Sequence, residues 1–380
     1  MYTEPRLPFL LLCLLPLAAA TLITTIHHAA FTDFLPYWAA ARLFLTHANP
    51  YSAQVLTIEA QAIGQYNHGM GFHYPTWSLP LIAPFGFLSL ARAQQLWLIA
   101  SLALNAFSAI GLWRYFGGDR RTAWIALAVF ATFTPLGTVE QMGQITPLVL
   151  ASLTGFLLLI KAERWVLAGI AVAGFGVKPH LLWLVILAIV IWMVRERRYR
   201  FLVSAAITWA ALWGAALLID PASAHFLRDS YGWTADQVYG TGGALRLLFG
   251  QSHRWLQYVP TVAGGLWFIG YWLRHEREWE WEKHLPLLLI VSVASSPYGA
   301  FHDYILVLPT FVALAVRGAW RSVSVIEGWV VVQVVILLPA NKAIESALSA
   351  VLWLGFWIFA SRKFAVSDHE SPVLRIGGNR

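Results

Sequence analysis

The chain has 380 residues, of which 58% are hydrophobic and 12% are charged. Because about a quarter of the residues in an average soluble domain are charged, this composition excludes an ordinary soluble globule. The formal net charge of +7 does not indicate nucleic-acid binding, since Lys and Arg occur in short clusters between apolar stretches. The single cysteine, Cys13, excludes an intramolecular disulfide and a cysteine-ligated metal site.

Apolar stretches long enough to cross a bilayer recur along the whole chain. A spanning helix needs about 20 apolar residues, because lipid offers the backbone no hydrogen-bond partners. The apolar run at the N-terminus continues to Ile26, which favours a retained helix over a cleaved signal peptide. We predict one all-α polytopic membrane domain over 1–380 with about twelve spanning helices, at 8–26, 94–113, 123–139, 145–160, 165–177, 180–194, 201–219, 257–273, 285–297, 303–316, 323–340 and 344–360.

The stretch 77–90 is a possible thirteenth span. It holds only about 14 apolar-rich residues and is interrupted by Pro80 and Pro84. Counting it as a span would place the basic cluster that begins at Arg114 outside the cell, against the positive-inside rule. We therefore interpret 77–90 as a re-entrant or interfacial helix within the first outer loop.

The basic residues orient these spans. With both termini in the cytoplasm, only seven of the 26 Lys and Arg residues lie outside: Arg42, Arg92, Lys178, Arg228, Arg246, Arg254 and Lys342. This bias predicts a multi-pass protein of the inner membrane. Two long segments, 27–93 and 220–256, then emerge on the periplasmic side, and long loops on one face of a scaffold commonly carry function.

The unusual polar residues also emerge on this outer face, although only Lys and Arg were used to orient the chain. They lie in the first loop or between later spans: His27, His28, Asp33, Arg42, His73, Tyr74, Glu140, Gln144, Lys178, His180, His302, Asp303 and Tyr304. Asp303 begins a span, and a charge there must face a cavity because burial in lipid is costly. The one-sided distribution predicts a polar cavity at the outer ends of the helices.

Each of these residues also has a purely structural interpretation. Asp33 could cap the helix that follows it, and Lys178 could extend from a span end toward water. His180 and His302 could be ordinary interfacial histidines, and Arg42 could bind either lipid headgroups or a substrate phosphate. The histidines lack metal-ligand spacing, and no Walker A, GxGxxG or GxSxG pattern occurs, so we predict no metal or nucleotide cofactor.

Several of these segments occur together in a known family. The order Asp33-Phe34, Asn49-Pro50-Tyr51 and Tyr74-Pro75 resembles the first outer loop of glycosyltransferase family 87. Further elements resemble the rest of that pattern, namely Gly143-Gln144-Ile145-Thr146-Pro147, Lys178-Pro179-His180 and Ser296-Pro297-Tyr298 followed by His302-Asp303-Tyr304. The resemblance covers about residues 8–310, and Thr76, Thr146 and Asp303 depart from the usual residues of the family.

The resemblance implies a GT-C type enzyme that uses a polyprenyl-phosphate-sugar donor and a lipid-linked or glycan acceptor. The expected sugar is a hexose, mannose in the typical members. Asp33 matches the acid of the first loop and would be the general base, giving inversion by direct displacement. The phosphate would be held by Lys178, His180, His302 and Arg42. The substrates would also contact His73, Tyr74, Glu140, Gln144, Asp303 and Tyr304.

Two other functions fit part of the pattern. A transporter or flippase would also be polytopic, but the halves of the sequence show no internal repeat and the charges gather at one interface. A catalytically silent assembly subunit would keep the scaffold without its chemistry. The joint presence of Asp33, Lys178, His180 and His302 favours an enzyme over both.

Overall fold

A computed structural model describes residues 31–64, 71–225, 239–336 and 342–369. Within these ranges, every regular element is an α-helix or a short 3-10 helix. Four features of the sequence analysis fall wholly or partly outside the described residues. They are the first span at 8–26, the pair His27-His28, the middle of the loop 220–256 and the last four residues of the span 323–340.

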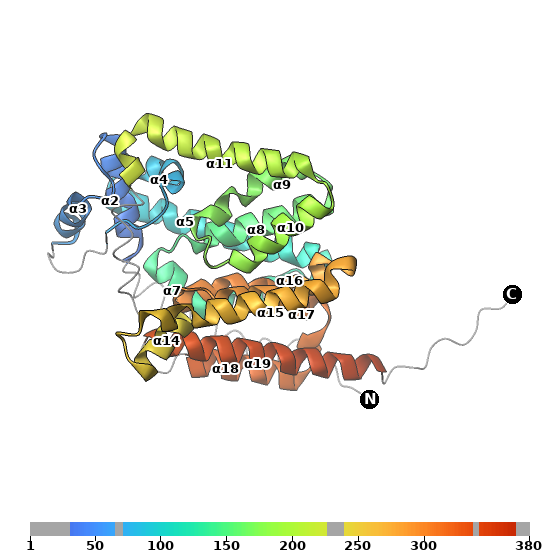
Figure 1. The fold of residues 1–380 in the computed structure, drawn as a ribbon. Coiled ribbons are helices and arrows are strands. Elements are labelled where there is room, and N and C mark those ends of the chain that lie inside the picture. The colour runs from blue at the N-terminus through green and yellow to red at the C-terminus, as the bar shows by residue number, and fades with distance from the viewer. Residues whose placement is uncertain (1–30, 65–70, 226–238, 337–341, 370–380) are drawn as a thin grey trace.

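Three short helices begin the described chain and lie at one end of the molecule (Figure 1): α2 (Phe34–Leu45), α3 (Gln54–Ile63) and α4 (Leu79–Gly86). Further helices, all but one of them longer than these three, run side by side away from this end. They are α5 (Leu90–Tyr115), α8 (Thr146–Lys161), α10 (Trp183–Arg195), α11 (Tyr199–Ile219), α15 (Val259–His275), α16 (Trp281–Ala294), α17 (Leu308–Val316), α18 (Val323–Ile336) and α19 (Lys342–His369). Each overlaps one predicted span.

The exterior of this bundle is apolar. α5, α11 and the segment Lys342–Arg362 of α19 are each long and apolar enough to cross a bilayer, and shorter apolar helices accompany them. Large apolar side chains on these helices point outward, as the 61% exposed Ile99 and the 62% exposed Ile207 illustrate. Contact with lipid requires such a surface, so the chain is a membrane protein, and its described part is entirely helical apart from turns and loops.

Three predicted spans are not single straight α-helices. One of them, 303–316, begins within the 3-10 helix η7 (Phe301–Val307) and continues as α17. The span 123–139 is broken between α6 (Trp124–Ala131) and α7 (Thr134–Met142), whose axes differ by 68°. Pro135 explains the break, because proline cannot donate a backbone hydrogen bond and fits only the first turn of a helix. The span 165–177 begins as α9 (Trp165–Ala171) and continues as the 3-10 helix η3 (Val172–Val177).

The stretch 77–90 contains the eight-residue helix α4, which is much shorter than the roughly 20 residues that a span requires. Pro80 lies in its first turn and Pro84 lies inside it. α4 packs closely on α2 at Gly86, where an added Cβ would lie 2.8 Å from the backbone carbon of Ala41. The short helix is therefore held against α2 at the end of the bundle (Figure 1).

α9 and α11 come into direct backbone contact at Gly169. A Cβ added there would lie 2.5 Å from the carbonyl oxygen of Phe201 and 2.9 Å from the backbone nitrogen of Ala205. Small residues allow helices in membranes to approach this closely. Gly169 therefore allows α9 and α11 to pack closely.

Gly169→Ala should lower the midpoint of thermal unfolding in detergent, because overpacking costs about 1–3 kcal/mol. Gly214→Ala in α11 is the matched control, since nothing lies within 4 Å of the position of its Cβ. The control should leave the midpoint unchanged or raise it slightly, because alanine favours helix more than glycine does. Equal midpoints for the two variants would contradict the contact.

Candidate functional site

A cavity of about 400 Å³ opens between segments that are distant in the sequence. Its lining comes from residues 33–37, 71–75 and 177–180, from α7, from the 3-10 helix η7 (Phe301–Val307) and from the start of α19. Seven of the residues proposed from the sequence line it: Asp33, His73, Tyr74, Gln144, Lys178, His180 and His302. They come from segments that are far apart in the chain, and tertiary packing brings them to one place.

The backbone places Asp33 beside the end of α7. Its amide N–H donates to the carbonyl oxygen of Met142 at 2.9 Å, immediately before α2 begins. The following residue, Gly143, has a φ of +67°, and a Cβ there would lie 2.7 Å from the Cβ of Phe34. Only glycine fits both the left-handed turn and this close approach. The turn brings Gln144 next to Asp33.

The side chain of Asp33 does not cap α2. It makes no capping hydrogen bond and instead accepts bonds from the Nε2 of Gln144 and, at 3.1 Å, from the hydroxyl of Thr32. The structural interpretation of Asp33 as a helix cap is therefore wrong. The carboxylate lies at the wall of the cavity, where a substrate can reach it.

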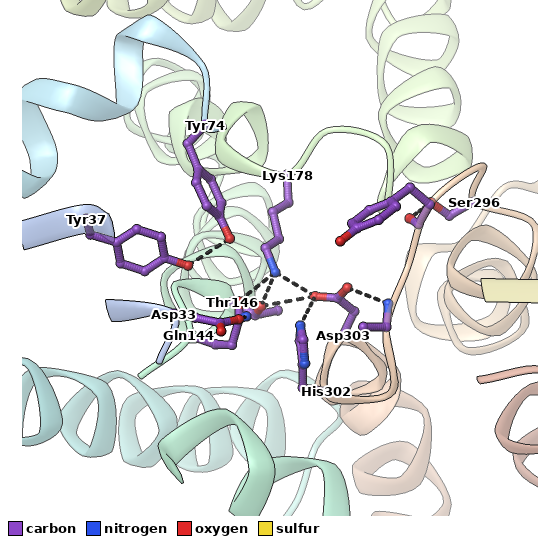
Figure 2. Close-up of polar contacts among 11 residues, drawn as sticks. Asp33, Tyr37, Tyr74, Gln144, Thr146, Lys178, Ser296, His302 and Asp303 are labelled. Carbon is purple, nitrogen blue, oxygen red and sulfur yellow. Dashed lines mark hydrogen bonds and ion pairs between the residues drawn. The ribbon is translucent and has the colours of Figure 1, made fainter. Parts of the chain in front are cut away.

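The Lys178 ammonium is the centre of the polar network (Figure 2). It donates to the Oδ1 of Asp303 at 2.7 Å, the Oε1 of Gln144 at 2.8 Å and the Oγ1 of Thr146 at 3.1 Å. A lysine has three N–H donors, so this set of acceptors uses all of them. Lys178 is only 6% exposed and Asp303 only 1%. The two form a buried ion pair.

The charge on Lys178 is retained in this setting. Burial alone would lower the pKa of Lys178, but the Asp303 carboxylate together with nearby Tyr74 and Asp33 outweighs it, and the pKa lies above its usual value. The second oxygen of Asp303 accepts the backbone N–H of Ala300 at 2.9 Å, and the Nε2 of His302 lies 3.7 Å from its Oδ1. Both carboxylate oxygens therefore face hydrogen-bond donors.

Gln144 connects the ion pair to Asp33. Lysine can only donate, so its contact identifies the carbonyl end of the Gln144 amide. The NH2 end then points to Asp33, to which it donates a hydrogen bond. Lys178 therefore determines which way the amide faces, and the amide in turn holds the Asp33 carboxylate at the cavity wall (Figure 2).

Aromatic residues form two walls of the cavity. On one side, the hydroxyl of Tyr37 donates to that of Tyr74 at 2.7 Å, and the Tyr74 ring lies 5.9 Å from the Lys178 ammonium. On the other side, the ring of Tyr298 lies 5.8 Å from that of His180 and 5.5 Å from that of Tyr239. Such rings can pack on the faces of a sugar and leave its edges to polar groups.

His180 is a neutral member of the site. Burial lowers its pKa to about 4, although nearby Asp303 opposes the shift. At neutral pH the imidazole therefore offers one N–H donor and one acceptor, but no charge. Its Nε2 atom is buried without a protein partner among the described residues.

Four residues proposed from the sequence do not line the cavity. Arg42 is exposed on α2 and lies over the ring of Trp38 at 5.0 Å, and Glu140 accepts bonds from Ser101 and Asn105 of α5. The hydroxyl of Tyr304 donates to the backbone of α19 at Ser346. Asp303 lies outside the cavity lining and accepts a hydrogen bond from Lys178, which does line the cavity. Their positions suit structural support better than direct contact with a substrate.

The sequence analysis missed several lining residues: Tyr37, Tyr239, Tyr298, Lys342 and Glu345. Tyr37 and Tyr298 lie close in the sequence to the proposed residues Asp33 and His302, and this proximity could have identified them as lining residues. Lys342 was counted only as an outer cation. Lys342 and Glu345 are three residues apart on α19 and so share a helix face, but nothing in the sequence indicates that this face meets the cavity.

No three His, Cys, Asp or Glu side chains within the described ranges are grouped so that they could hold a metal ion.

The family model for glycosyltransferase family 87 matches residues 72–297, which is more than half of the chain. The match includes Tyr74, Gln144, Lys178 and His180, and it confirms the resemblance seen in the sequence. No significant match to a curated protein or to a solved structure was found.

Lys178→Met should destabilise the protein by about 3–5 kcal/mol, because it leaves the buried Asp303 carboxylate without a cation. The double variant Lys178→Met/Asp303→Asn removes that charge and should recover much of the stability. Thermal unfolding of both proteins in detergent measures the difference. Equal destabilisation of the single and the double variant would show that the ion pair is not what stabilises this region.

Proposed function

The chain belongs to glycosyltransferase family 87 and is a membrane glycosyltransferase; on this premise, we propose that it uses a polyprenyl-phosphate-sugar as donor. We further propose that it transfers a hexose, with mannose as the expected sugar, to a lipid-linked or glycan acceptor. The observation that carries this proposal is the Asp33 carboxylate at the cavity wall, oriented by Gln144 and supported by the buried Lys178–Asp303 pair.

In the proposed reaction, Asp33 accepts the proton of an acceptor hydroxyl as that oxygen attacks the anomeric carbon. The bond between this carbon and the phosphate oxygen breaks, and its electron pair leaves with the polyprenyl phosphate. One displacement by a hydroxyl on the opposite face inverts the anomeric centre. A positioned general base of this kind contributes roughly 10²–10⁴-fold to the rate.

The cavity offers different groups to each part of the substrates. Tyr74 and Tyr298 present aromatic faces to a sugar, while His73 and His180 lie on the lining as groups able to form hydrogen bonds. Lys178 and Asp303 together carry no net charge. We propose that Lys178 acts mainly by positioning Gln144 and through its positive field near Tyr74.

We propose that the chain crosses the inner membrane about twelve times, with cytoplasmic termini and with α4 as an interfacial or re-entrant element. Supporting this, seven of the eleven site residues that the Lys and Arg count places outside line one cavity. The short helices α2, α3 and α4 gather at the same end (Figure 1). The active site would then face the periplasm, with donor and acceptor presented from the outer leaflet.

Asp33→Asn should reduce sugar transfer by at least about 100-fold, because the amide cannot accept the proton. The measurement is transfer of labelled mannose from polyprenyl-phosphate-mannose to a lipid extract by the purified protein, with product identification. The variant should be present in membranes at the level of the unsubstituted protein.

Asp119→Asn is the control for loss of a carboxylate, since Asp119 is exposed and does not line the cavity. It should transfer normally. Normal transfer by Asp33→Asn would remove Asp33 as the base. Absence of transfer from every polyprenyl-phosphate-sugar by the unsubstituted protein would contradict the proposed donor and favour an assembly role.

Titration of His180 should not weaken donor binding as the pH rises from 5 to 8. The pKa of this residue is lowered by burial to about 4, so its imidazole is already neutral throughout the interval. A histidine with the ordinary pKa of about 6.5 would lose its charge there and release an anionic ligand. The test compares the pH dependence of the donor KM in the unsubstituted protein and in His180→Gln. A rise in KM centred near pH 6.5 that disappears in the variant would contradict this assignment.

A further inference from the structure

The charged groups of the cavity do not contribute equally to anion binding. Four of its lining residues carry charges: Asp33, Lys178, Lys342 and Glu345. Lys178 is compensated by Asp303 at 2.7 Å, and its other donors are bound to Gln144 and Thr146. To bind a phosphate directly, Lys178 would have to leave the 1% exposed Asp303 without its cation. Lys178 is therefore poorly placed to be the primary ligand of an anion.

Lys342 has the opposite character. Its side chain is exposed at the cavity, and no carboxylate within the described ranges lies at ion-pair distance from its ammonium. The ammonium lies 5.8 Å from the centre of the Tyr239 ring, which can orient a cation without neutralising it. Among the described lining residues, Lys342 is the cation that can give its N–H donors to a ligand.

The surroundings of Lys342 indicate the kind of anion. Lys342 lies in the first described turn of α19, which packs against α14 (Gly240–Phe249). Two residues later a stripe of exposed apolar side chains begins on the same helix: Ile344, Leu348 and Val351. The spacing of four and three residues places them along one face, which at 100° per residue lies on the opposite side of α19 from Lys342. The helix that carries the cavity cation therefore presents an apolar surface to lipid on its other side.

A cation that faces the cavity from a lipid-embedded helix suits an anion carried on a long hydrocarbon. We propose that Lys342 binds the phosphate of a polyprenyl phosphate at the cavity. This inference rests on the proposed function and assigns the phosphate site to α19 rather than to Lys178, His180, His302 or Arg42. Glu345, one turn further along α19, lies on the same wall and repels a phosphate placed deeper on that side.

The test is a binding measurement with a long-chain polyprenyl monophosphate that carries no sugar, using the purified full-length protein in nanodiscs. The matching polyprenol, which lacks the phosphate, and inorganic phosphate as competitor are the other two probes. The unsubstituted protein should bind the lipid phosphate more tightly than the polyprenol. Lys342→Gln should weaken binding of the lipid phosphate by about tenfold or more, as expected for loss of a charge-assisted hydrogen bond. Binding of the polyprenol should not change.

Two variants control for charge and folding. Lys342→Arg keeps the cation and should bind the lipid phosphate at nearly the unsubstituted level. Arg92→Gln removes an exposed cation outside the cavity lining, at the start of α5, and should have no effect. Equal binding by Lys342→Gln and the unsubstituted protein would overturn the proposal. Displacement of the lipid by inorganic phosphate at comparable concentrations would also overturn it, because it would identify a site for free phosphate.

The same set of proteins separates this inference from the proposed function. Binding of lipid phosphate that depends on Lys342, together with no sugar transfer by the unsubstituted protein, would support the phosphate site and refute the transferase proposal. Normal transfer by Lys342→Gln with unchanged donor KM would refute the phosphate site and leave the transferase proposal intact. Failure of the unsubstituted protein to distinguish the lipid phosphate from the polyprenol would refute the site directly.

Discussion

The buried ion pair between Lys178 and Asp303 is the interaction on which the site depends. It joins the end of η3 to η7, and its additional bonds reach the start of α8 at Thr146 and the turn after α7 at Gln144. A charge removed from water must be compensated, so neither residue can move away without a large cost. The pair therefore fixes four chain segments relative to one another and determines how Gln144 presents its amide to Asp33.

This arrangement separates the tasks of the charged residues. Because Lys178 and Asp303 neutralise each other, they supply geometry more than net charge. Asp33, oriented by Gln144 at the cavity wall, is the carboxylate that we propose for proton transfer, and Lys342 is the cation that we propose for an anionic ligand. Burial makes His180 neutral at physiological pH, which suits hydrogen bonding to substrates. A base and a cation that are not paired with each other can serve two different substrates.

The polar residues lie where helices break or begin. Gln144 follows the left-handed turn at Gly143, Lys178 follows the 3-10 helix η3, and His302 and Asp303 lie within η7. In a membrane, backbone that leaves regular helix is tolerated only where it is buried in protein or faces a polar cavity. The irregular segments thus mark the cavity, and the same irregularity turns their side chains toward it. Regular helices such as α5 and α11 supply the scaffold between them.

The sequence by itself determined the helical class, the order and approximate ends of most of the described helices, and the gathering of Asp33, Gln144, Lys178 and His302 at a common site. The lengths of the apolar runs and the distribution of Lys and Arg between them are local properties, so they can be read along the chain. Only the tertiary structure decided that Asp303 neutralises Lys178, that Arg42, Glu140 and Tyr304 lie off the cavity, and that Lys342 and Glu345 line it. The break at Pro135 and the contact of α19 with the site also appeared only there. Spacing identifies which residues share a helix face, but the partner of that face is set by packing between segments hundreds of residues apart.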